Sequence, residues 1–303
     1  MLLPWCAYAQ EVDISQEISI AGFFPLQGSG RQVYNFNPGW RFYRGDVSGA
    51  EAADYDDSAW EVVSVPHSVQ LMPAEASGCR NYQGVAWYRK HFTVPAELEG
   101  MDVSLHFEAI MGKQKFYING RLVKEHLGGY LPVTLSLTEA GVKAGEECVI
   151  AVCADNSDDK DYPPGKTQYT LDFAYHGGIY RDVWMIGKSP VAITDAVEAG
   201  KVADGGVFVH FDNLSEESAE VYVNTNVKNS SSSARRVTVE TTLTDADGKV
   251  IKKVSDRVAL PAGADRTTMQ RIVVKQPKLW SPDSPYIGWS RALRMAAVPS
   301  TEV

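Results

Sequence analysis

The residues of this chain whose types could do chemistry gather in one run, from Asp172 to Trp184, which reads Asp-Phe-Ala-Tyr-His-Gly-Gly-Ile-Tyr-Arg-Asp-Val-Trp. Its paired glycines allow a tight turn and a close approach of the backbone. Asp172 precedes the turn with a carboxylate that can accept hydrogen bonds. Arg181 and Asp182 flank the start of an expected strand and could form an ion pair. Residue types alone therefore predict a structured loop that enters a strand.

The remaining titratable side chains do not have the spacing of a metal or cofactor site. The acidic run from Asp155 to Asp161 could hold a cation, but it lacks the glycine and the twelfth-position glutamate of an EF-hand loop. The other histidines lie in strand and loop contexts without ligand spacing, and we expect structural roles for them: His67, His91, His106, His126 and His210. The sequence thus predicts no metal and no cofactor.

The four cysteines do not predict a disulfide framework in a chain of 303 residues. Cys148 and Cys153 lie in one apolar run that is typical of a buried strand. Five positions apart, they point to opposite faces of that strand and cannot bridge each other. Cys79 is a lone loop cysteine, so buried structural thiols are the favoured interpretation.

Composition excludes two classes of partner. The formal net charge is −9 and the pI is near 5.2, whereas a nucleic-acid binder normally presents a basic face to the phosphates. No apolar run reaches the roughly 20 residues that a membrane-spanning helix needs. We therefore expect neither nucleic-acid binding nor a membrane span.

The elements that must position the candidate residues are short β-strands. Apolar and polar residues alternate in several segments, as in half-buried antiparallel strands: residues 103–107, 115–118, 207–211 and 237–241. Asn119-Gly120 and Asp247-Gly248 stand between such segments and predict hairpins whose turn residues both have positive φ. Helical periodicity is nearly absent. Many short strands with frequent turns predict β-sandwiches rather than alternating helices and strands.

A change of composition near residue 188 divides the chain. The part before it is rich in aromatic residues and glycine motifs, whereas the part after it is rich in Val, Thr and Ser until Trp280. The second stretch, up to residue 286, has the length and spacing of an immunoglobulin-like sandwich. We predict one sandwich over residues 23–187 and a smaller one over 188–286.

Several motifs together resemble family 2 of the glycoside hydrolases, the β-galactosidase-like family. Residues 177–184 closely resemble the signature near the end of that family's sugar-binding domain. Other segments resemble family motifs in the same order: Val65-Pro66-His67, Gly84 to Pro95, Tyr117 to Gly120, His126 to Pro132, Val152 to Asn156, and Leu279 to Tyr286. The resemblance covers about residues 33–286, and its motifs are specific in combination.

This resemblance implies a jelly-roll sugar-binding domain, then an immunoglobulin-like domain, then a (β/α)₈ barrel that does the chemistry. A barrel needs roughly 250 residues, and only residues 287–303 follow the second sandwich. The family's two catalytic glutamates, which retaining glycoside hydrolysis requires, are barrel residues without counterparts here. We therefore expect the non-catalytic front part of a glycosidase, inactive alone, which would pack on the barrel and self-associate without it.

The resemblance also implies two residues that touch the sugar. In β-galactosidases of the family, the first domain sends an Asn and an Asp to the rim of the barrel pocket, and their positions match Asn81 and Asp172. His176 and Tyr175 lie close by in sequence and are candidate pocket-lining residues. The alternative is that Asn81 and Asp172 are ordinary turn or capping residues. A lectin-like module that binds carbohydrate by itself is the alternative to an enzyme fragment.

Both ends of the chain carry further predictions. Residues 1–9 end in Ala7-Tyr8-Ala9, a small-x-small pattern that resembles the end of a secretory signal, so we expect export to the periplasm or beyond. Cys6 would leave with that signal. Residues 287–303 are basic and rich in alanine where the family continues with an alternating strand. A frameshift or truncated gene model explains this tail better than its alternative, an amphipathic helix.

Overall fold

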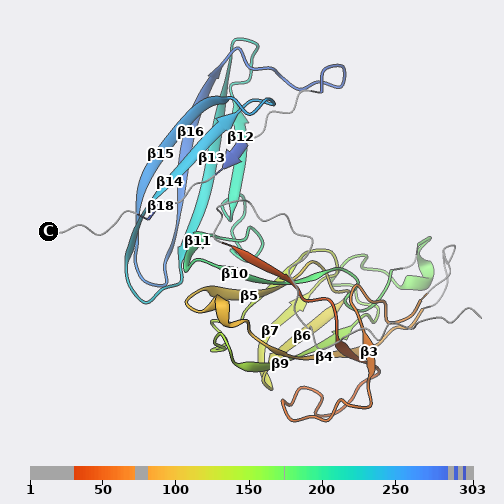
Figure 1. Cartoon of the computed structure of the whole chain (residues 1–303). Helices are drawn as coiled ribbons and strands as arrows, with labels where there is room; N and C mark the ends of the chain where they lie inside the picture. Colours follow the sequence, from red (N-terminus) through yellow and green to blue (C-terminus); the bar gives the residue numbers. More distant parts are fainter. Residues whose placement is uncertain (1–30, 72–80, 174, 286–289, 293–295, 298–303) are drawn as a thin grey trace, which may run out of the picture. The chain divides into compact units, whose positions relative to one another are not determined.

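The computed structural model describes residues 31–71, 81–173, 175–285, 290–292 and 296–297. The chain divides into two compact units (Figure 1). The first contains residues 33–97 and 104–186, and the second contains residues from 187 onward together with 98–103. In the described part of the chain, strands make up the regular structure apart from two short 3₁₀ turns, Ala96–Leu98 (η1) and Gln168–Thr170 (η2). The predicted all-β fold class is thereby confirmed.

The first unit is a sandwich of two sheets. The larger sheet has the order β3-β2-β4-β9-β6-β7, and its strands are β2 (Trp40–Arg44), β3 (Glu61–Val63), β4 (Val85–Thr93), β6 (Lys113–Ile118), β7 (Arg121–Leu127) and β9 (Glu147–Asp155). The smaller sheet has the order β1-β10-β5-β8, with β1 (Gln32–Asn35), β5 (Asp102–Phe107), β8 (Val133–Ser136) and β10 (Val183–Lys188).

Aromatic side chains fill the space between these sheets. Trp40 of β2 and Phe107 of β5 are fully buried, and their ring centroids lie 6.2 Å apart across the sandwich. Phe36 packs edge-on against Trp40 at 5.7 Å, a favourable geometry for aromatic quadrupoles. Lys90 of β4 is also fully buried here, and its Nζ donates to the Phe36 carbonyl at 3.2 Å. The fully buried ammonium group therefore holds the turn that follows β1.

The outer face of β4 is covered as well, because a buried cation holds a long loop against it. Arg89 is fully buried, and its Nε donates to Asp57 Oδ2 at 2.8 Å. Its Nη1 donates to the carbonyls of Ala50 and Ala52 at 2.5 and 2.9 Å. The loop between β2 and β3 is thus fastened to the sheet by one guanidinium group.

The two predicted hairpins form with different turns. Asn119 and Gly120 join β6 to β7 with φ values of 49° and 80°, as a two-residue turn requires. The second hairpin has a five-residue loop, 245–249, in which Gly248 has a φ of 82°. Asp245 Oδ1 accepts from the backbone N–H groups of Asp247 and Lys249. This side-chain turn replaces the predicted two-residue geometry.

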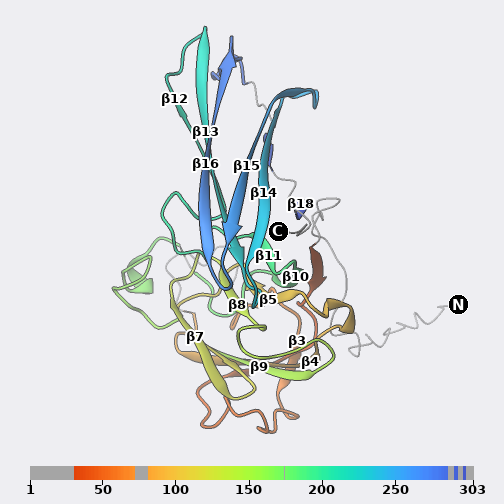
Figure 2. The ribbon, with the colours of Figure 1, turned by 90° about the vertical axis from the view of Figure 1, so that its left-hand side faces the viewer.

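The second unit is a smaller sandwich (Figure 2). One sheet contains β11 (Val191–Ile193), β12 (Val207–Asp212), β13 (Ser218–Asn229) and β16 (Asp265–Lys275). The other contains β14 (Arg235–Thr244), β15 (Val250–Leu260), β17 (Ser290–Ala292) and β18 (Ala296–Ala297). Its core is small and aliphatic: Val227 of β13 packs with Val237, Val239, Val258 and Leu260 of the facing strands.

Cys148 and Cys153 both lie in β9 as free thiols, as predicted. Burial raises the pKa of Cys148 to about 12 and that of Cys153 to about 11, so both remain protonated and unreactive near neutral pH. Cys6, Cys79 and the expected signal site at residues 7–9 lie outside the described residues.

Two pieces of the C-terminal tail are described, and both are strands. β17 and β18 pair with β14, with Thr242 opposite Arg291 and Thr238 opposite Ala296. The frameshift interpretation of this tail stays a prediction. None of the helices in the described part of the chain is long and apolar enough to cross a membrane.

The buried Arg89–Asp57 pair leads to a stability prediction. Asp57→Ala leaves a guanidinium group buried without its carboxylate, which should lower the free energy of unfolding by about 3–5 kcal/mol. Glu125→Gln is the matched control, since Glu125 pairs with Lys115 at 3.7 Å on the exposed surface and should cost less than about 1 kcal/mol. Urea unfolding followed by tryptophan fluorescence measures both. Equal losses would contradict the role given to Arg89.

Candidate functional site

The Asn81 side chain binds a segment that is distant in sequence. Its Nδ2 donates to the backbone carbonyl of Tyr175 at 2.6 Å, across 94 positions. Its Oδ1 is buried and has no hydrogen-bond partner in the described structure. The side chain therefore does not make the local turn bond of the alternative interpretation. It holds one end of the 172–184 run and leaves one acceptor unused.

A second amide binds the same carbonyl group. Gln168 is 2% exposed, and its Nε2 donates to the Tyr175 oxygen at 3.1 Å. This bond closes a loop of seven positions that carries Asp172, which is exposed. Asn81 and Asp172 are thus brought to one part of the first unit by way of Tyr175. Nothing in the local sequence around Gln168 indicated this role.

Asp158 anchors the same loop through its carboxylate. Its Oδ1 accepts from Gln83 Nε2 at 2.6 Å, from the backbone N–H of Gln168 at 3.0 Å and from the Tyr175 hydroxyl at 3.1 Å. Burial, followed by this hydrogen bond to Asp158, raises the pKa of Tyr175 to about 12. The Tyr175 ring is 5% exposed, so this residue contributes its backbone carbonyl to the site while its ring packs inside.

The two glycines of the run are required by close contacts. A Cβ on Gly177 would lie 2.4 Å from Asn156 Nδ2, and a Cβ on Gly178 would lie 2.3 Å from the Tyr88 hydroxyl. Gly178 also has a φ of +99°, which L-residues rarely adopt. Asn156 in turn holds the Asn81 segment, since its Nδ2 donates to the Tyr82 carbonyl at 2.8 Å.

Residues 67–69 run beside the segment after Tyr175. The N–H of His67 donates to the Ile179 carbonyl at 2.7 Å, and the N–H of Val69 donates to the Gly177 carbonyl at 3.0 Å. Between them, Ser68 Oγ lies 3.0 Å from His176 Nδ1. His176 is half-buried, so its ring stands at the edge of the site. Ser68 is a site residue that the sequence did not indicate.

This arrangement offers acceptors to a ligand. Asn81 Oδ1 and Gln168 Oε1 are both buried without partners in the described structure, and an unsatisfied buried acceptor costs on the order of 1–3 kcal/mol. Asp172 adds an exposed carboxylate. Ordered water, or the hydroxyl donors of a ligand that reaches the site, would satisfy the two amide oxygens.

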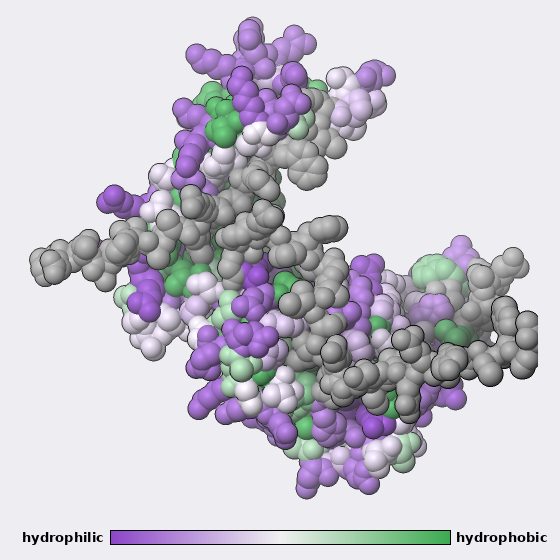
Figure 3. Space-filling view, in the orientation of Figure 1, coloured by the Kyte–Doolittle hydropathy of each residue, from purple (hydrophilic) through white to green (hydrophobic). Residues whose placement is uncertain are grey.

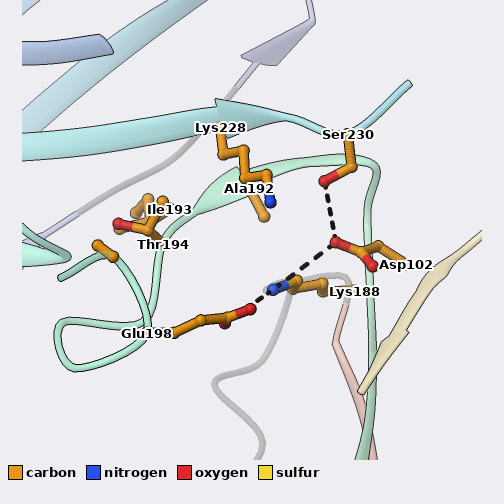
Figure 4. Close-up of a pocket in the computed structure, with 9 residues that line it drawn as sticks. Asp102, Lys188, Ala192, Ile193, Thr194, Glu198, Lys228 and Ser230 are labelled. Carbon is orange, nitrogen blue, oxygen red and sulfur yellow. Dashed lines mark hydrogen bonds and ion pairs between the residues drawn. The ribbon is translucent and has the colours of Figure 1, made fainter. Parts of the chain in front are cut away.

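The second unit, which includes residues 98–103 and 187–188 at the ends of β5 and β10, contains a small pocket that does not suit such a ligand (Figure 4). Its volume is about 60 Å³, room for a few waters. Lys188 Nζ lies 3.7 Å from Asp102 Oδ2 and 3.8 Å from Glu198 Oε2, and Ser230 Oγ donates to Asp102 at 3.0 Å. Asp102, Lys188 and Glu198, three of the charged side chains that line it, thus compensate one another.

Among the described residues, no group of three or more His, Cys, Asp or Glu is placed to hold a metal ion. Figure 3 shows hydrophobic residues scattered among hydrophilic ones on the described part of one face. Large exposed apolar side chains nevertheless occur in both units, among them Leu131 (62%) and Met269 (65%).

Comparison with known proteins gives one family for both units. The model of the sugar-binding domain of glycosyl hydrolases family 2 matches residues 48–190, and a second model of glycosyl hydrolases family 2 matches residues 203–287. A β-galactosidase of Thermoanaerobacter pseudethanolicus is 33% identical over 85% of the chain and 32% of its own length. A β-glucuronidase of Formosa agariphila is 30% identical over 86% of the chain and 28% of its own length.

Solved structures that resemble the chain come from the same kinds of protein. The chain resembles the crystal structure of a Bacteroides uniformis β-glucuronidase with a TM-score of 0.74 and 28% identity, over 84% of this chain and 29% of that one. A family 2 member from Bacteroides cellulosilyticus gives a TM-score of 0.67 and 26% identity, over 88% and 34%. The chain therefore spans roughly 30% of the length of the relatives it matches.

The contact between Gly178 and Tyr88 gives a direct test of how the site is held. Gly178→Ala should lower the free energy of unfolding by about 2–3 kcal/mol, because a Cβ meets a buried hydroxyl and φ is strained. Gly39→Ala is the matched control: its φ is +75°, but nothing lies within 4 Å of the added Cβ, so it should cost about 1 kcal/mol. Thermal and urea unfolding measure both, and equal effects would refute the close contact.

Proposed function

Because the chain belongs to family 2 of the glycosyl hydrolases, we propose that it is the non-catalytic N-terminal region of a retaining, β-galactosidase-like enzyme. That enzyme hydrolyses terminal β-glycosides. Both kinds of relative, β-galactosidase and β-glucuronidase, fit such a substrate class. The two sandwiches occupy the described residues from 31 to 285, and a catalytic barrel would need roughly 250 residues more. We infer that the catalytic carboxylates do not belong to the two sandwiches.

The contribution of this chain is sugar recognition by the loop cluster around Tyr175. This cluster consists of residues 67–70, Asn81, Gln168, Asp172 and residues 175–179. The observation that carries it is the buried Oδ1 of Asn81, which has no partner among the described residues and is held in place by the bond from Nδ2 to the Tyr175 carbonyl. Asp172 is carried on the adjoining loop and is exposed. A sugar hydroxyl can donate to either group. The barrel would supply the remaining contacts, so the cluster alone forms part of a pocket.

We also propose that the chain is exported and that it packs on another domain. Export follows from the Ala7-Tyr8-Ala9 pattern. Exposed apolar side chains such as Met269 (65% exposed) and Trp280 (62%) suit a surface that packs on another domain. Without that domain, the same side chains favour self-association.

We expect the purified chain to show no glycosidase turnover. The purified 303-residue chain, incubated with a chromogenic β-galactoside and a chromogenic β-glucuronide, should release product no faster than buffer, since we place the carboxylate pair of a retaining glycosidase outside the two sandwiches. Heat-denatured protein is the control for contaminants. Enzyme-like turnover that survives repeated purification would overturn the assignment as a non-catalytic region.

Sugar binding by the chain should be weak and should depend on Asp172. In titrations with methyl β-galactoside followed by NMR, Asp172→Ala should weaken binding about tenfold, because a charged acceptor is lost. Asp161→Ala is the control, since Asp161 is an exposed aspartate of the nearby acidic run, and it should leave affinity within about twofold. An Asp172→Ala chain that binds like the unaltered one would exclude Asp172 as a sugar contact.

The strength of binding separates this proposal from a lectin-like module. A partial pocket predicts dissociation constants well above the millimolar range, whereas an independent carbohydrate-binding module should give calorimetric heat with millimolar sugar. Titration calorimetry with galactose, lactose and plant oligosaccharides distinguishes the two.

A further inference from the structure

The His176 ring is oriented by a hydroxyl group with a defined hydrogen-bond pattern. Ser68 Oγ lies 2.9 Å from the Gln70 carbonyl and 3.0 Å from His176 Nδ1. A serine hydroxyl has one proton, and a carbonyl oxygen can only accept. If the Ser68 proton goes to Gln70, the hydroxyl oxygen must accept from His176. The ring then carries its proton on Nδ1.

The loop that carries Ser68 is itself held firmly on both sides. The N–H groups of His67 and Val69 donate to the backbone of residues 177 and 179. Gln70 Oε1 accepts from the N–H of Tyr82 at 2.6 Å, directly after Asn81. Ser68, His176 and Asn81 therefore belong to one connected set of hydrogen-bonded segments.

The other nitrogen of His176 remains available. His176 Nε2 has no hydrogen-bond partner among the described residues. It is also absent from the set of fully buried polar atoms without a partner, so it is accessible. In a neutral imidazole protonated on Nδ1, Nε2 carries a lone pair and acts as an acceptor. His176 directly follows Tyr175 in the sequence, and the backbone carbonyl of Tyr175 accepts the hydrogen bond from Asn81.

His67, on the neighbouring loop, has the opposite pattern. Its Nδ1 lies 2.9 Å from the Tyr88 hydroxyl, which has one proton to donate. If the Tyr88 proton goes to His67 Nδ1, His67 accepts there and carries its own proton on Nε2. Burial lowers the pKa of His67, in agreement with a neutral ring.

We propose that Ser68 fixes His176 as the Nδ1–H tautomer, so that Nε2 accepts a hydrogen bond from a sugar hydroxyl beside Asn81. His176 is then a sugar-contacting residue, and Ser68 is the residue that positions it. The first half of this inference, the tautomer, stands on the protein alone. The second half, the sugar contact, rests on the proposed function.

The tautomer is measured directly on the full chain. Long-range ¹H–¹⁵N correlation spectra at pH 8 of protein labelled in its six histidines should give His176 as the Nδ1–H form and His67 as the Nε2–H form. Substitution of each histidine by Gln assigns its signals. In Ser68→Ala the Nδ1–H population of His176 should fall about twofold or more, while Ser68→Thr, which keeps the hydroxyl, should restore it. An Nε2–H form in the unaltered chain, or no response to Ser68→Ala, would overturn the inference.

The sugar contact is tested on the same samples. Titration with methyl β-galactoside should shift the Nε2 signal of His176 and leave that of His67 unchanged. His176→Asn keeps a donor for Ser68 but does not reach the Nε2 position, so affinity should fall about three- to tenfold. His176→Gln places an amide near that position and should retain affinity within about threefold.

The outcomes separate this inference from the proposed function. Binding that depends on Asp172 but leaves His176 Nε2 unshifted would refute the sugar contact of His176 and leave the proposed function intact. If His176 has the expected tautomer and sugar perturbs no residue of the loop cluster, sugar recognition by this chain fails, and with it the second half of the inference.

Discussion

The candidate site depends on the position of one backbone segment, residues 175–179. Two amides, from Asn81 and Gln168, donate to the Tyr175 carbonyl, and residues 67–69 donate to the carbonyls of residues 177 and 179. Because buried backbone groups must be paired, these bonds leave the segment few alternative positions. Positions 177 and 178 require glycine in this close packing, since a Cβ on either would collide with a buried polar atom.

The sandwich beneath the segment is stabilised by charges that it buries on both faces of one strand. Arg89 of β4 fastens the loop before β3, and Lys90 of β4 fastens the turn after β1. Each cation replaces its lost hydration with carbonyl oxygens, and Arg89 also with the carboxylate of Asp57. Adjacent residues of a strand point to opposite faces, so a single pair of positions connects the outer loop, the sheet and the inner core.

Local features of the fold could be predicted from sequence, whereas its long-range contacts could not. The segments 103–107 and 237–241 alternate with period two, and both form strands. Asn119-Gly120 predicts its turn because two adjacent residues suffice for that geometry. At Asp247-Gly248 the register of β14 and β15 left five residues in the loop, and Asp245 then set the turn. Asn81 and Tyr175 are 94 positions apart, and no local pattern reports such a contact. Gln168 and Ser68 have residue types that are common in any loop, so only the folded chain reveals what they hold.

The fastening of residues 175–179 by backbone groups also has an evolutionary consequence. The bonds to residues 177 and 179 involve N–H and C=O groups, which every amino acid except proline provides in full. Side chains at positions 172 and 176 can therefore be exchanged while the frame that presents them stays in place. Under the proposed function, drift at these two positions changes the sugar contacts without first requiring a rebuilt sandwich.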